Sequence, residues 1–98
     1  MSELLQTSGM DRTQVPRIEK HFRFQWEPAQ DCYVLLYPEG MIKMNGSAGE
    51  ILAVCDGERS IDDIIDLLQT KFPDAGDLAD DILEFLTVAH EKRWIAVN

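Results

Sequence analysis

LLYPEGMIKMNGSAGEIL, residues 35–52, decides the fold, because the spacing of its apolar residues changes there from that of a strand to that of a helix. The PEG triplet at 38–40 predicts a tight turn, in which the glycine is expected to accept a positive φ. Residues 41–44 (MIKM) after this turn predict a strand. Ser47 and Glu50 have the spacing of a capping box, which predicts that a helix begins there.

Two further strands are predicted upstream of this stretch. Phe22, Phe24 and Trp26 alternate with polar residues, and this period of two is typical of a strand with one buried face. Residues 32–37 (CYVLLY) form a continuous apolar and aromatic run, as expected of a strand that is covered on both faces. The three strands predict an antiparallel meander, with residues 32–37 in its centre and residues 41–44 at an edge.

Two further helices are predicted downstream. Ser60 stands three positions before Asp63 and opens a helix that Pro73 ends. Asp77 opens the third helix, and residues 94–97 (WIAV) predict a short final strand or an extended tail. The predicted fold class is therefore α+β and winged-helix-like: a three-stranded antiparallel meander followed by three short helices, with a possible short C-terminal strand.

The length of 98 residues corresponds to one domain. Residues 1–14 are small and polar without a sustained period, so we expect a flexible N-terminal tail followed by a single winged-helix-like domain over residues 15–98. No apolar run approaches the ~18–20 residues that span a bilayer, and the chain does not begin like a signal peptide. We therefore expect a cytoplasmic protein, in which Cys32 and Cys55 are free thiols within the core.

The net charge of −9 is concentrated in the second half of the chain. Residues 1–45 hold 6 acids and 5 bases, whereas residues 46–98 hold 12 acids and 4 bases. Such a surface repels polyanions, so nucleic acids and anionic membranes are not expected as partners.

The sequence offers no constellation that predicts catalysis or metal binding. The acid pairs at 62–63 and 80–81 fall in the first turns of predicted helices, where the helix dipole stabilises negative charge. His21 and His90 lie in no zinc-binding or metalloprotease pattern, and no phosphate-binding glycine loop is present. We therefore predict a protein that is not an enzyme and has no catalytic residues, no metal and no cofactor.

Binding at a sheet edge remains as a function. The predicted edge strand carries only Lys43 to discourage pairing, and an added peptide strand is a recurrent way to use such an edge. The alternative is that a helix or a second copy of the chain covers the edge. Either a monomer or a homodimer is consistent with the sequence, and a dimer through this edge would compete with a peptide for one surface.

Residues 35–52 also carry a resemblance to a known family. This stretch resembles the signature of the PqqD family in turn, edge strand and first helix, in the same order. The entry at Pro16–Arg17, the strand at 22–27, the CDG triplet at 55–57 and the closing helix extend the resemblance over roughly residues 16–97.

The resemblance implies a function. Members of the PqqD family have a winged-helix-like fold, the RiPP recognition element. They bind the precursor peptide PqqA and present it to the radical S-adenosylmethionine enzyme PqqE during pyrroloquinoline quinone biosynthesis. They are peptide chaperones without a cofactor.

Transferred to this chain, the resemblance implies a leader peptide that adds beside the third strand, in a cleft against the third helix. The expected peptide-binding residues on the strand are Met41, Ile42, Lys43 and Met44. Those on the helix, chosen by helical phase, are Leu83, Thr87 and His90.

A winged-helix nucleic-acid-binding domain is the alternative that this architecture permits. Residues 47–91 contain only Arg59 and Lys71 as bases, whereas a recognition helix needs Lys and Arg that reach phosphates and base edges. The charge distribution therefore disfavours this alternative.

Overall fold

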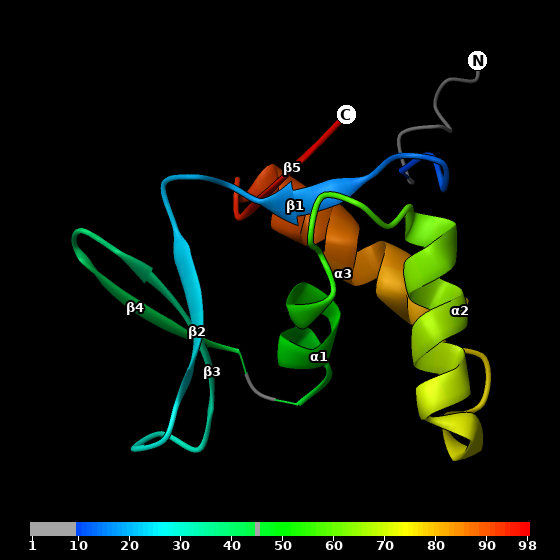
Figure 1. Ribbon diagram of the computed structural model, residues 1–98, viewed down its shortest axis with the longest axis horizontal. Coiled ribbons are helices and arrows are strands. Elements are labelled where there is room, and N and C mark those ends of the chain that lie inside the picture. Colours follow the sequence, from blue (N-terminus) through cyan, green and yellow to red (C-terminus); the bar gives the residue numbers. More distant parts are fainter. Residues whose placement is uncertain (1–9, 45) are drawn as a thin grey trace.

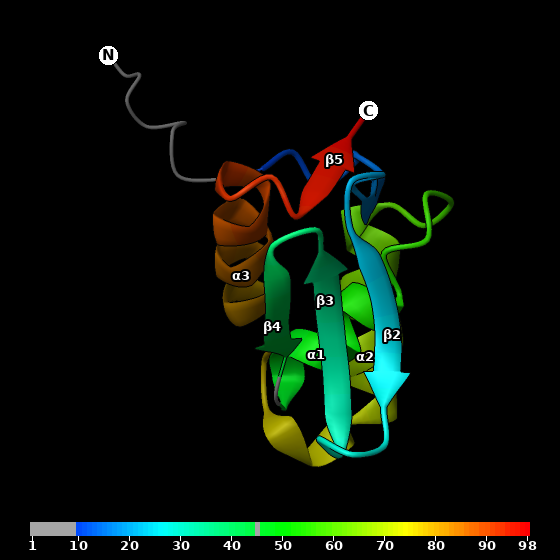
Figure 2. The same ribbon diagram turned by 90° about the vertical axis from the view of Figure 1, so that its left-hand side faces the viewer.

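A computed structural model of the chain describes residues 10–44 and 46–98, and it has the predicted α+β architecture (Figure 1). The strands β2 (Arg23–Glu27), β3 (Cys32–Tyr37) and β4 (Gly40–Met44) form an antiparallel sheet in the order β2-β3-β4. The helices are α1 (Ser47–Ala53), α2 (Ile61–Lys71) and α3 (Ala79–Glu91), with a short 3-10 turn, η2 (Pro73–Ala75), between the last two. All three helices lie on one side of the sheet, so the opposite sheet face is left without a helix (Figure 2).

A second, two-stranded sheet joins the two ends of the domain. The strand β5 (Ile95–Val97) confirms the predicted C-terminal strand, and it pairs antiparallel with β1 (Pro16–Ile18). From the sequence, Pro16–Arg17 marks only the entry to the domain, because three residues are too few to display a period. The amide of Gly57 donates to the carbonyl of Pro16 at 3.0 Å, which ties this small sheet to the segment between α1 and α2.

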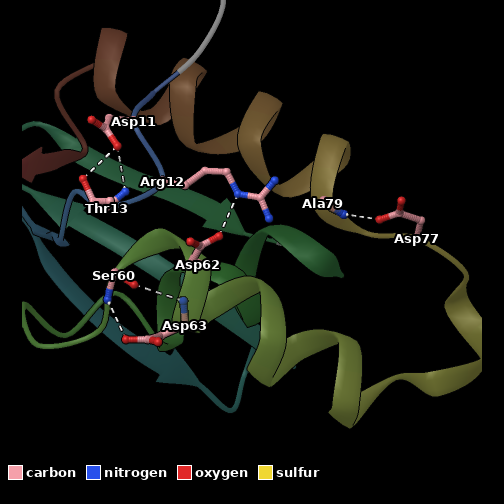
Figure 3. Close-up of polar contacts among 8 residues, drawn as sticks. All are labelled: Asp11, Arg12, Thr13, Ser60, Asp62, Asp63, Asp77 and Ala79. Atoms are coloured by element: carbon pink, nitrogen blue, oxygen red, sulfur yellow. Dashed lines mark hydrogen bonds and ion pairs between the residues drawn. The ribbon is translucent and has the colours of Figure 1, made fainter.

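Residues 11–14 differ from the predicted tail, because they are hydrogen-bonded to the start of α2. The amides of Ile61 and Asp62 donate to the carbonyls of Gln14 and Arg12, at 2.9 and 3.0 Å. Arg12 Nε also lies 2.7 Å from Asp62 Oδ1 (Figure 3). These contacts provide acceptors for amides that a helix start leaves unpaired. The remainder of the predicted tail, residues 1–9, lies outside the described part of the chain.

The core lies between the sheet and the helices. It joins Leu35 and Met44 of the sheet to Ile51 and Leu52 of α1 and to the apolar stripes of α2 and α3. The helix α1 approaches the sheet closely at Gly49, where an added Cβ would lie 2.7 Å from the Met44 carbonyl oxygen. Only glycine fits there without displacing backbone.

The helix starts agree only partly with the predictions. At α2 the capping box is confirmed: Asp63 N–H donates to Ser60 Oγ at 3.1 Å, and Ser60 N–H donates to Asp63 Oδ2 at 3.2 Å (Figure 3). At α1 the prediction is wrong, because Gly46 is the N-cap with a φ of 58° and no side chain of a described residue caps the helix. Ser47 is instead the first residue of the helix.

The third helix begins two residues after Asp77, whose carboxylate accepts a hydrogen bond from Ala79 N–H at 3.0 Å. The expectation of a positive φ at Gly40 is also wrong, because the glycines with positive φ are Gly46, Gly57 and Gly76. Among residues 10–44 and 46–98, the structure contains no helix that is long and apolar enough to cross a membrane.

Candidate functional site

The strand β4 forms one edge of the sheet, and its register determines which of its backbone groups face outward. Tyr37 pairs with Gly40 across a two-residue turn, and Leu35 pairs with Ile42 further along the hairpin. The pair that flanks a two-residue hairpin turn exchanges hydrogen bonds, and every second pair after it does the same. The N–H and C=O groups of Met41 and Lys43 therefore point away from β3, toward the open edge.

The four β4 residues predicted to bind a peptide divide into two pairs by the direction of their side chains. Met41 and Lys43 project from the sheet face away from the helices, and both are exposed, Met41 by 42%. Ile42 is half-buried and packs against the core. Met44 is only 3% exposed and belongs to the core itself. An added strand would therefore contact the backbone of Met41 and Lys43 and the side chain of Ile42, but not that of Met44.

The predicted residues on α3 lie together on one flank of the helix. Leu83, Thr87 and His90 are spaced as one face, and the hydroxyl of Thr87 donates to the Leu83 carbonyl oxygen at 2.8 Å. Phe85 and Val88 lie on the opposite flank, roughly 160° away around the axis at 100° per residue. The buried stripe of α3, which contains Ile82, Leu86 and Ala89, separates the two flanks.

One flank of α3 lines a groove between the three helices. The groove has a volume of about 500 Å³. It extends from Gly46, two positions after the end of β4, to Phe85 of α3. Its apolar wall is formed by the following side chains: Ile51, Leu68, Phe72, Leu78, Ile82 and Phe85. Leu83, Thr87 and His90 do not line it. Phe85 therefore lies on the flank of α3 that borders this groove, together with the start of α1.

The sequence-based prediction of the site did not single out this flank. Val88 is 38% exposed although it is apolar, and Phe85 is partly buried against the core and lies 6.4 Å from the Trp94 ring, centroid to centroid. The available signal was the exposed apolar Val88 one turn from Phe85. Both flanks of α3 carry apolar residues, so the sequence alone did not determine which flank would face a bound peptide.

Two side chains near the end of α1 with shifted pKa values, Cys55 and Asp56, do not line the groove. Within the described ranges, no three His, Cys, Asp or Glu side chains gather as a metal site. Burial, with a smaller contribution from the Asp56 charge, raises the pKa of the Cys55 thiol to about 12, so this thiol stays protonated at neutral pH. A hydrogen bond from the Glu58 amide lowers the pKa of the exposed Asp56 carboxyl, with smaller contributions from Arg59. These groups stabilise a loop and lie outside the groove.

The chain is similar in sequence to several known proteins. A sequence profile described as Coenzyme PQQ synthesis protein D (PqqD) matches residues 32–95. A protein of Azotobacter vinelandii named PqqA binding protein is 52% identical over 84 residues, which cover 86% of this chain and 91% of that protein. A protein of the same name from Pseudomonas aeruginosa strain UCBPP-PA14 is 56% identical over the same shares of the two chains.

A solved structure has the same fold. It is the solution NMR structure of the PqqD truncation of Methylobacterium extorquens PqqCD, described as a functional, stand-alone RiPP recognition element. It superposes with a TM-score of 0.72 at 24% identity, over 91% of this chain and 96% of the other. The profile match and the identity to the two relatives show that this chain belongs to the PqqD family.

Proposed function

We propose that this protein binds the precursor peptide PqqA as an added strand at the open edge of β4 and presents it to the radical S-adenosylmethionine enzyme PqqE. The protein acts as a peptide chaperone in pyrroloquinoline quinone biosynthesis and performs no catalysis itself. The names of the relatives support PqqA as the ligand. The PqqE step is the role that family resemblance implies.

The single observation that carries the proposal is the orientation of the β4 backbone. The outward N–H and C=O groups of Met41 and Lys43 offer alternate donors and acceptors, which is the pattern that an extended peptide completes. Outside the strand ladders, no backbone hydrogen bond among the described residues uses the amide of either one. Ile42, which packs against the core, would supply an apolar contact to the peptide, as would the partly buried Phe85 and the exposed Val88 of α3. We propose these two α3 residues in place of Leu83, Thr87 and His90.

The charges of the helical half favour a peptide over a nucleic acid. Its bases between residues 47 and 91 are both paired: Arg59 Nη1 lies 2.7 Å from Asp56 Oδ2, and Lys71 Nζ lies 3.0 Å from Glu50 Oε1. Phosphate contacts would require breaking these ion pairs. The winged-helix architecture is therefore used here without its nucleic-acid chemistry.

Two proline variants of β4 test the proposal. Lys43→Pro removes an outward amide and leaves the pairing with β3 intact, so the protein should fold and bind a labelled PqqA peptide at least about tenfold more weakly. Met44→Pro removes an inward amide opposite Tyr33 and should chiefly destabilise the sheet. Lys43→Ala is the matched control, and it should weaken binding less than about fivefold because an exposed charge contributes little.

The measurement is a fluorescence anisotropy isotherm for each variant, with circular dichroism as the check of folding. Tight binding by a folded Lys43→Pro variant would place the peptide elsewhere. A Lys43→Ala variant as weak as Lys43→Pro would show that the side chain, rather than the backbone, makes the contact.

A further inference from the structure

The sheet has a second edge, β2, whose outward groups follow from the same hairpin. Since Tyr33, Leu35 and Tyr37 bond to β4, the residues between them bond to β2. Their partners on β2 are Arg23, Gln25 and Glu27. The N–H and C=O groups of Phe24 and Trp26 therefore point outward, away from β3.

This second edge pairs with no other strand in the part of the chain that the structure describes. The sheet order places β2 at its end, and Figure 2 shows no strand beside it. Outside the strand ladders, none of the backbone hydrogen bonds between described residues involves Phe24 or Trp26. Trp26 is 49% exposed, although its ring packs edge-on against Tyr33 at a centroid distance of 5.2 Å. A large exposed aromatic side chain beside unpaired backbone is a typical feature of an interface.

The sequence of β2 is symmetric about its central residue. RFQWE has Gln25 at its centre, an aromatic residue on each side, and Arg23 and Glu27 at equal distances with opposite charges. Within the described chain, neither charged side chain takes part in an ion pair. In an antiparallel pair related by a two-fold axis at Gln25, Arg23 of one copy stands opposite Glu27 of the other.

We propose that β2 pairs antiparallel with β2 of a second copy of this chain, with Gln25 on the two-fold axis. Phe24 then stands opposite Trp26 of the second copy, and both use the outward backbone groups identified above, so register and hydrogen bonding agree. The aromatic pairs lie on the face toward the helices, where Phe24 already stacks on Tyr33 at 4.8 Å. The two Arg23–Glu27 pairs lie on the opposite face. Opposite charges in such cross-strand positions stabilise pairing.

This dimer leaves the proposed peptide site free. The two sheets join into one of six strands, with β4 at each outer end, so the dimer binds two peptides. A dimer through β4, as the sequence analysis considered, would instead exclude the peptide. The net charge of −9 on each copy opposes association, so a weak dimer is expected.

Charge reversal tests the pairing by sedimentation equilibrium of the full chain. Arg23→Glu and Glu27→Arg each replace two opposite-charge pairs with two like-charge pairs, and each should raise the dimer dissociation constant about tenfold. The double variant Arg23→Glu/Glu27→Arg restores both pairs and should return the constant to within about threefold of the parent. Lys20→Glu makes the same charge change as Arg23→Glu at an exposed position outside the strand, and it should change the constant less than about threefold.

A parent protein that stays monomeric up to about 1 mM, the weak end of specific association, would overturn the proposal. Single reversals without effect, or a double variant as weak as the singles, would overturn it as well. Circular dichroism confirms that each variant is folded. Because β4 lies at the other edge, the monomeric Arg23→Glu variant should bind PqqA peptide as the parent does, which separates this proposal from the proposed function.

Discussion

Two serines at the starts of neighbouring helices have different structural roles, although an acidic residue follows each of them three positions later. Ser60 exchanges hydrogen bonds with Asp63, whereas Ser47 is exposed and Glu50 binds Lys71 instead. We expect Ser60→Ala to lower the free energy of unfolding by about 0.5–2 kcal/mol, because an amide of α2 loses its acceptor. Ser47→Ala should change it by less than about 0.5 kcal/mol.

Urea denaturation of the two variants and the parent measures both effects. Equal losses for the two serines would mean that Ser47 contributes to α1 in a way that the hydrogen bonds do not reveal. No loss for Ser60→Ala would mean that water replaces the capping hydroxyl without cost.

This contrast also shows how far a local sequence pattern predicts the start of a helix. Both capping patterns are local, yet only one forms, because Gly46 with its positive φ turns the chain into α1 before Ser47. The need for Gly49 cannot be seen in the sequence, since it arises from close approach to Tyr33 of β3 and Met44 of β4. Local patterns therefore predicted where helices lie, and tertiary contacts determined how they begin.

At the scale of an element, α3 has two flanks with different expected roles. Val88 is exposed on the flank of Phe85, and His90 is exposed on the other. Val88→Glu places a charge beside the proposed peptide and should weaken PqqA binding about tenfold. His90→Glu makes the same change in charge away from the peptide and should change the affinity less than about twofold.

Titration of both α3 variants with labelled PqqA peptide distinguishes the flanks. The reverse order of effects would restore the flank of Leu83, Thr87 and His90, which helical phase alone had selected. The strands were easier to predict than this flank, because the turn and the edge strand both lie in the contiguous residues 35–44. Their register was not predicted, and the pairing of Tyr37 with Gly40 defines it. The periodicity of α3 predicts which of its residues are buried. It does not predict how the helix is oriented, because that depends on how α3 packs beside α1 and α2.

At the scale of the whole molecule, the three-stranded meander leaves two open edges at opposite ends of one sheet. Successive residues of the central strand β3 form hydrogen bonds alternately with β2 and with β4. The register of β3 therefore determines which backbone groups of both edge strands point outward. One edge ends beside the core with the half-buried Ile42, and the other has a self-complementary sequence. Because the two edges lie at opposite ends of the sheet, the proposed peptide and the proposed second copy would not compete.

Residues 11–14 are hydrogen-bonded to the start of α2, and β1, which follows them, pairs with β5 near the C-terminus. Removal of this N-terminal segment should therefore destabilise the whole fold. A variant lacking residues 1–9 keeps the carbonyls of Arg12 and Gln14 that accept from α2, whereas a variant lacking residues 1–14 loses both. We expect the longer truncation to lower the free energy of unfolding by about 1–3 kcal/mol relative to the shorter one, because the amide of Ile61 begins a helix whose first side chain is fully buried.

Urea denaturation of the two truncations measures this difference, and Arg12→Ala in the full chain separates the ion pair from the backbone bonds. Arg12→Ala should cost less than about 1 kcal/mol, because both partners of its ion pair with Asp62 are about half exposed. If Arg12→Ala costs as much as the longer truncation, the side chain rather than the carbonyls ties residues 11–14 to α2. If the two truncations are equally stable, solvent replaces those carbonyls without cost, and the predicted domain boundary at residue 15 describes the energetics better than the hydrogen bonds do.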